Sequence, residues 1–163
     1  MKHIFSGVIL SFSLILGGCN STGEVKEVNL TEVDEDADKS ATEIFEERAQ
    51  EYKEKKGITL ESKDIQFDMV NNLDKSFLLG GYGELSSYYN YGYTNESKFF
   101  SVLLTPFDDS DSWYVYFDRK LYHELFDKLK ENQLTAIYID AVIPSNVYQP
   151  SQGNMAVAKA AKF

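Results

Sequence analysis

The sequence predicts a mainly β protein with helices, an α+β domain in which one helix precedes a small five-stranded barrel. Two observations lead to this fold class. Between residues 77 and 163, five apolar or β-forming segments are separated by clusters of turn-forming residues. An amphipathic helical pattern falls between the third and fourth of these segments, and another helical pattern precedes them all.

The first helix is expected over residues 40–56. Ser40 and Glu43 have the spacing of a capping box, in which each residue hydrogen-bonds to the backbone N–H of the other. Lysines crowd the last turn, where they complement the helix dipole, and Gly57 stands where a helix commonly ends. The apolar stripe of this helix is narrow, so we expect it to pack on the surface of the domain.

Residues 58–76 give an ambiguous pattern. Ile65, Phe67 and Met69 alternate as in a short strand, but two asparagines then interrupt the run.

The pattern becomes clear from residue 77 onward. The expected strands, in chain order, are Phe77–Leu85, Phe99–Leu104, Trp113–Phe117, Ala136–Ile143 and Met155–Phe163. Glycines interrupt the first strand, which indicates a bulge or a sharp bend. An amphipathic helix is expected over Arg119–Asn132, with Asp118 as its N-cap.

This order of three strands, a helix and two strands resembles that of the OB-fold, a five-stranded, partly open barrel. The resemblance is topological, spans about residues 77–163 and carries no diagnostic motif. The OB-like barrel region as a whole is expected over about residues 58–163. A different α+β sheet with helices on one face fits the same order.

The N-terminus has the pattern of a secretory signal. Lys2 supplies a positive start, Ile4–Leu16 is apolar apart from small residues, and Leu16-Gly17-Gly18-Cys19 follows. The apolar run is too short to span about 30 Å of hydrocarbon, which needs roughly 20 residues.

Leu16-Gly17-Gly18-Cys19 resembles the lipobox of bacterial lipoproteins. The resemblance implies a signal peptide over residues 1–18, cleavage between Gly18 and Cys19, and diacylglycerol on the Cys19 sulfur with further acylation (palmitate in many cases) of the new amino group. It also implies a cell-envelope location. In a Gram-negative organism, Asn20 in place of Asp favours the outer membrane; otherwise the protein faces outward from its single membrane. Cys19 is the only cysteine, so no internal disulfide can form.

The charge is unevenly distributed along the chain. Residues 19–39 are acidic and poor in large apolar groups, so we expect a flexible tether that leads to a single globular domain over residues 40–163. Residues 77–163 carry seven basic and ten acidic side chains, a net charge of −3. Single-stranded nucleic acid needs a basic groove, so this composition argues against a nucleic-acid partner.

Most catalytic and metal-binding patterns are absent from the sequence. His123 is the only histidine after the predicted cleavage site, and neither a zinc-ligand spacing nor a Gly-x-Ser-x-Gly turn occurs. We therefore expect no cofactor, no metal and no catalytic residue. An acidic pair for hydrolysis stays open, because no particular pair among the 26 acids stands out.

Tyrosines provide the candidate site. Tyr88, Tyr89, Tyr91 and Tyr93 form one group. On the strand expected nearby, alternation directs Tyr114 and Tyr116 outward, whereas Trp113, Val115 and Phe117 point inward. Tyrosine combines apolar area with a polar tip, as contact surfaces require. The group is either a ligand surface or a covering of the barrel wall.

Together these patterns predict a membrane-anchored, non-catalytic binding or assembly module of the cell envelope. The candidate partners are an envelope polysaccharide, a peptide or a membrane protein. Two alternatives remain: a small envelope hydrolase with an acidic pair, and a structural or exclusion factor that binds another membrane protein.

The lipobox interpretation makes a direct prediction. Protein from membranes of the native host should begin at Cys19 and carry two or three acyl chains in intact mass spectrometry. Cys19→Ala should leave an uncut precursor without lipid, because the acylated sulfur is lost. Continued lipid labelling of that variant would contradict the interpretation.

Overall fold

The computed structural model describes residues 40–131, 134–151 and 153–163. The predicted signal peptide, the cleavage site at Gly18 and Cys19, and the acidic segment 19–39 lie outside the described residues. No helix among the described residues is both long and apolar enough to cross a membrane.

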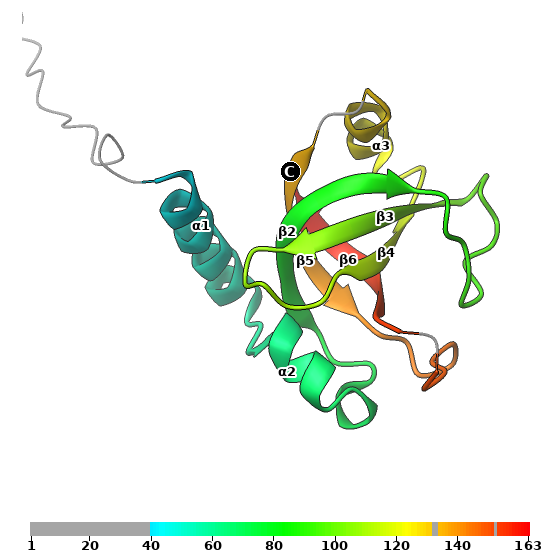
Figure 1. Cartoon of the computed structure of the whole chain (residues 1–163), viewed down its shortest axis with the longest axis horizontal. Coiled ribbons are helices and arrows are strands. Elements are labelled where there is room, and N and C mark those ends of the chain that lie inside the picture. The colour runs from blue at the N-terminus through cyan, green and yellow to red at the C-terminus, as the bar shows by residue number, and fades with distance from the viewer. Residues whose placement is uncertain (1–39, 132–133, 152) are drawn as a thin grey trace, which may run out of the picture. The chain divides into compact units, whose positions relative to one another are not determined.

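The centre of the fold is a five-stranded barrel. Its strands are β2 (Phe77–Ser86), β3 (Phe99–Pro106), β4 (Trp113–Asp118), β5 (Thr135–Val142) and β6 (Met155–Lys162). They follow the order β2-β3-β4-β6-β5, and β5 also pairs with β2, which closes the barrel (Figure 1). The β4–β6 pair is parallel and the other barrel pairs are antiparallel. The mainly β, OB-like fold class predicted from the sequence is confirmed.

Strand β2 bends because glycines remove side chains where neighbouring strands approach. Gly81 pairs with β3 on one side and with β5 on the other. A Cβ atom at Gly81 would collide with the Thr105 backbone and lie 2.8 Å from a Leu104 methyl carbon. A Cβ atom at Gly83 would lie 2.6 Å from the Ile137 side chain. The glycine bend expected from the sequence is therefore a requirement of barrel closure.

The barrel interior forms the hydrophobic core. Trp113, Val115 and Phe117 are fully buried, as the alternation in this strand predicted. Other fully buried side chains come from every barrel strand and from the helical segments 62–67 and 123–130, among them Ile65, Phe77, Leu79, Phe100, Leu104, Leu125, Ile137 and Ile139.

Helix α1 (Ala41–Lys56) precedes the barrel as predicted. The Ser40 hydroxyl accepts a hydrogen bond from the Glu43 N–H at 3.3 Å, and the Glu43 carboxylate accepts one from the Ser40 N–H at 2.7 Å. Gly57 ends the helix with φ of 65°. Both caps expected from the sequence are therefore present.

One aromatic side chain docks α1 on the outer wall of the barrel. The Phe45 ring stacks on Phe107 with centroids 5.1 Å apart, and lies 5.9 Å from Tyr82 and 6.1 Å from Tyr138. The Tyr138 hydroxyl donates a hydrogen bond to the Phe45 carbonyl oxygen at 2.9 Å. Burial of this group therefore fixes the helix against β2 and β5.

Residues 58–76 fold differently from the short strand that their alternation resembles. Only the two-residue strand β1 (Leu60–Glu61) forms, parallel to the start of β2, and it leads into helix α2 (Ser62–Phe67) and a 3-10 turn (Val70–Asn72). Ile65 is fully buried, but Phe67 is 94% exposed, so these residues do not share a buried strand face. The Asp64 carboxylate caps α2 by accepting a hydrogen bond from the Glu61 N–H at 2.9 Å.

Helix α3 (His123–Lys130) lies between β4 and β5, but starts later than Arg119. The Asp118 carboxylate accepts hydrogen bonds from the N–H groups of Lys120 and Leu121 at 2.9 and 3.1 Å, so it caps a separate turn before the helix. Leu121 is consequently exposed.

Two adjacent glycines provide a matched test of barrel closure. Gly81→Ala should lower the free energy of unfolding by about 3 kcal/mol, because the new methyl group meets backbone that cannot move aside. Gly80→Ala should change it by less than about 1 kcal/mol, since its Cβ would lie 3.4 Å from the Phe107 and Tyr138 rings. Urea denaturation measures both values, and equal losses would contradict this account of the bend.

Candidate ligand-binding surface

The structure brings the predicted tyrosines together beside strand β4. Four of them lie in the loop over residues 87–98, which joins β2 to β3, and Tyr114 and Tyr116 lie on β4. Figure 1 shows this loop extending beyond the ends of β2 and β3.

Five tyrosine rings form a continuous group, which we call the tyrosine cluster: Tyr88, Tyr91, Tyr93, Tyr114 and Tyr116. The Tyr88 and Tyr114 centroids are 4.4 Å apart at an angle of 35°, and the Tyr93 and Tyr116 rings stack at 5.0 Å and 14°. Tyr91 joins these pairs, since it lies 6.3 Å from Tyr88 and 6.2 Å from Tyr116. Tyr89 is half-buried in the same loop.

A tight turn presents the loop tyrosines. The Tyr93 N–H donates a hydrogen bond to the Asn90 carbonyl oxygen at 2.9 Å, and the two central residues, Tyr91 and Gly92, have φ of 58° and 84°. Positive φ at both central positions is the requirement of a type I′ turn. Glycine adopts such a φ freely, whereas a tyrosine there is uncommon and stores about 1–3 kcal/mol of strain.

Asn90 ties this turn to the barrel. Its backbone N–H donates a hydrogen bond to the Tyr116 hydroxyl oxygen at 3.2 Å. Its side-chain amide donates another to the Tyr88 hydroxyl oxygen at 3.1 Å. Asn90 therefore links the half-exposed Tyr88 to Tyr116 of β4.

Two of the tyrosines in the predicted ligand surface are buried. Tyr116 is fully buried and Tyr91 is 3% exposed. Tyr116 belongs to the buried hydrophobic cluster, and the loop packs against it through Tyr91, Tyr93 and Asn90. The accessible rings are Tyr88, which is 38% exposed, and the half-buried Tyr89, Tyr93 and Tyr114.

The buried hydroxyl groups of the cluster stay protonated well above neutral pH. Burial raises the pKa of Tyr116 from 10.0 to about 12, against a smaller lowering by the hydrogen bond from Asn90. Burial, followed by the neighbouring Tyr88 hydroxyl, raises the pKa of Tyr91 further. Burial also raises the pKa of Tyr93. The cluster is thus a neutral aromatic surface.

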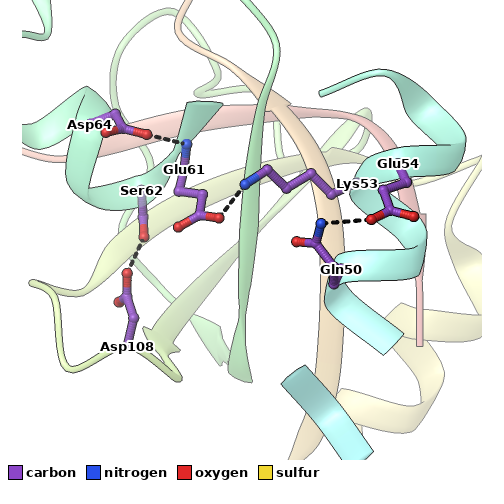
Figure 2. Close-up of polar contacts among 7 residues, drawn as sticks. All are labelled: Gln50, Lys53, Glu54, Glu61, Ser62, Asp64 and Asp108. Atoms are coloured by element: carbon purple, nitrogen blue, oxygen red, sulfur yellow. Dashed lines mark hydrogen bonds and ion pairs between the residues drawn. The ribbon is translucent and has the colours of Figure 1, made fainter. Parts of the chain in front are cut away.

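Sequence reasoning missed a groove between α1 and the barrel. Its volume is about 380 Å³, and it is lined by Glu46, Ala49, Gln50, Glu61, Ser62, Leu78, Gly80, Phe107 and Asp108. Figure 2 shows its polar side, where an ion pair between Lys53 and Glu61 connects α1 to β1. The lining comes from four separate segments, so no local motif in the sequence marks it.

Asp108 is the acid of this groove whose carboxylate accepts hydrogen bonds from two serine hydroxyls. Its carboxylate accepts hydrogen bonds from the Ser62 hydroxyl at 2.8 Å and from the Ser110 hydroxyl at 2.5 Å. Burial raises the pKa of Asp108, but the hydrogen bonds from Ser110 and Ser62 outweigh it and hold the pKa below its ordinary value. Asp108 is therefore ionised at neutral pH, and its carboxylate ties Ser62 of α2 to the turn that follows β3.

The part of the chain that the structure describes contains no candidate metal-binding site. No group of three His, Cys, Asp or Glu side chains there is placed to hold a metal ion. His123 stands exposed in the first turn of α3.

The fold and the cluster together define a small OB-like barrel with a tyrosine-rich surface. No protein-family model, no curated protein sequence and no solved structure matches this chain.

The raised tyrosine pKa values predict alkaline instability. Above about pH 10 the Tyr116 hydroxyl ionises in the unfolded chain, whereas in the folded protein it stays protonated up to about pH 12. Its contribution to the free energy of unfolding is therefore complete below about pH 10 and is lost as the pH rises to about 12. Urea denaturation across this range should show a falling free energy of unfolding. The Tyr116→Phe variant should be less stable at neutral pH by about 1 kcal/mol, because it loses the hydrogen bond from Asn90. Its free energy of unfolding should fall less steeply as the pH rises. A slope unchanged by the substitution would contradict the assignment.

Proposed function

We propose that this protein is a lipid-anchored lipoprotein of the bacterial cell envelope and a non-catalytic module that binds a sugar-containing polymer. The tyrosine cluster is the observation that carries the binding proposal. In OB-folds, ligands bind on the second and third barrel strands and on the loop between the first and second strands. Here those elements are β3, β4 and residues 87–98, and the last two of them hold the cluster.

The chemistry of the cluster favours a neutral oligosaccharide. Tyr88 and Tyr114 present apolar ring faces, on which the C–H face of a sugar ring can stack. The tyrosine hydroxyl groups and the Asn90 side chain supply hydrogen-bonding partners for sugar hydroxyls. A neutral chain also avoids the electrostatic penalty that a polyanion meets at a region of net charge −3.

The packing of the cluster keeps the accessible rings in place before a ligand arrives. Tyr88 is held by its contact with Tyr114 and by the hydrogen bond from Asn90, while the turn itself rests on the buried Tyr91 and Tyr116. A prearranged surface loses little conformational entropy on binding.

The proposed location in the cell envelope rests on the sequence, through the lipobox resemblance at Cys19. Two or more acyl chains give stable membrane anchoring, and an anchored domain meets the polymers of the envelope at high local concentration. The location and the proposed ligand are thus mutually consistent.

Substitution of the accessible rings tests the binding proposal. The full chain, purified in a non-ionic detergent, is titrated by calorimetry with glycan fragments of the bacterial cell wall and with neutral oligosaccharides. Tyr88→Ala and Tyr114→Ala should each weaken binding about tenfold, because each removes a stacking surface worth on the order of 1 kcal/mol.

Tyr82→Ala is the matched control. Tyr82 is also 38% exposed, but it lies in the aromatic group that docks α1. Its substitution should leave the affinity unchanged even where it lowers stability. Equal weakening by all three substitutions, or no saturable binding, would refute the proposal. Hydrolysis of the glycan would instead indicate that the protein is a small envelope hydrolase. Co-purification of a membrane protein would indicate an exclusion factor.

A further inference from the structure

A second pocket, distinct from the tyrosine cluster, gathers positive charge. Its volume is about 370 Å³, and Arg48 of α1, Lys128 of α3 and Lys162 of β6 contribute to its lining. The remaining lining residues are Phe45, Leu134, Thr135, Ala136, Tyr138 and Phe163. Three elements far apart in the sequence therefore each contribute one basic residue to the lining of the same pocket.

This charge distribution contrasts with that of the whole chain, whose net charge is −10. Although the sequence holds 26 acidic residues, no Asp or Glu lines the pocket. The ion pairs between described residues are Lys53–Glu61 and Lys159–Asp140, so neither involves a pocket cation. Three basic residues around one pocket make its potential locally positive, and a bound anion would be attracted to it.

The pocket lining also contains aromatic and aliphatic side chains. The Phe163 ring lies 5.1 Å below the Lys128 ammonium group, and Phe45 and Tyr138 form the side next to α1. Leu134, at 66% exposure, is an unusually open leucine. Cations next to aromatic and aliphatic surface suit a ligand that has both a charged and an apolar part.

We propose that this pocket binds a phosphate group carried on an apolar body. A guanidinium group matches two phosphate oxygens at once, and the two ammonium groups add point charges. The shared chemistry is that of a phosphomonoester or phosphodiester, which an anionic phospholipid or a soluble organic phosphate can supply. The proposal uses none of the tyrosine-cluster residues and does not depend on the function assigned to them.

Neutralising substitutions test the site in the full chain, kept in a non-ionic detergent. The probes are inorganic phosphate, glycerol phosphate, and micelles of the same detergent doped with phosphatidylglycerol or with phosphatidylcholine. Backbone amide shifts of Ala136 and Lys162 report occupancy. Lys128→Gln combined with Lys162→Gln should weaken binding about tenfold or more, through loss of two charged contacts.

The matched control is Lys55→Gln combined with Lys120→Gln. It makes the same change in net charge at two exposed lysines outside the pocket, and it should retain the affinity. Thermal unfolding verifies that both double variants fold. A variant that unfolds is replaced by Arg48→Gln, which also removes a pocket cation but from a different element.

The probes separate the two sources of phosphate. Saturation by inorganic phosphate or glycerol phosphate supports a site for soluble anions. Saturation only by phosphatidylglycerol, with phosphatidylcholine inactive, supports a lipid headgroup site. Absence of saturation by every probe would overturn the proposal, as would equal weakening by the control and pocket variants.

Discussion

The double pairing of strand β2 is the constraint on which the rest of the structure depends. Its first part pairs with β5 and its last part with β3, and residues 81–83 pair with both at once. A strand can change partners within a few residues only if it bends sharply, which requires backbone to approach backbone and side chain. Gly81 and Gly83 allow that approach, and the intervening Tyr82 keeps its side chain on the outer wall.

Two aromatic surfaces lie on either side of this bend, and they pack against different parts of the chain. Near the bend, Tyr82 and Tyr138 form a wall that Phe45 of α1 covers, and the contact is completed by a hydrogen bond to the helix backbone. Beyond the bend, β2 runs into the loop 87–98, which packs against Tyr116 of β4 through its own tyrosines and Asn90. The first surface is partly covered by α1, although Tyr82 stays 38% exposed, whereas no helix packs on the rings of the second surface in the contacts described above.

The fold could be predicted from the sequence because its signals are local. Glycines in one strand, the capping box at Ser40, and the alternation of Trp113, Val115 and Phe117 each act within a few residues. The burial of Tyr116 could not be predicted, because it depends on a loop more than twenty residues away in the sequence. The α1 groove and the basic pocket share this property, since every wall comes from a different segment.

The strain at Tyr91 supports the proposal of a ligand surface. Asn or Gly at this position would adopt the same positive φ at little cost. Instead the chain places a tyrosine there, at a cost of about 1–3 kcal/mol, and buries its ring between Tyr88 and Tyr116. The ring of Tyr91 thereby supports Tyr88, which remains 38% exposed beside Tyr114. Strain that positions an accessible ring is consistent with recognition, because a rigid aromatic surface binds with less loss of entropy than a loose one.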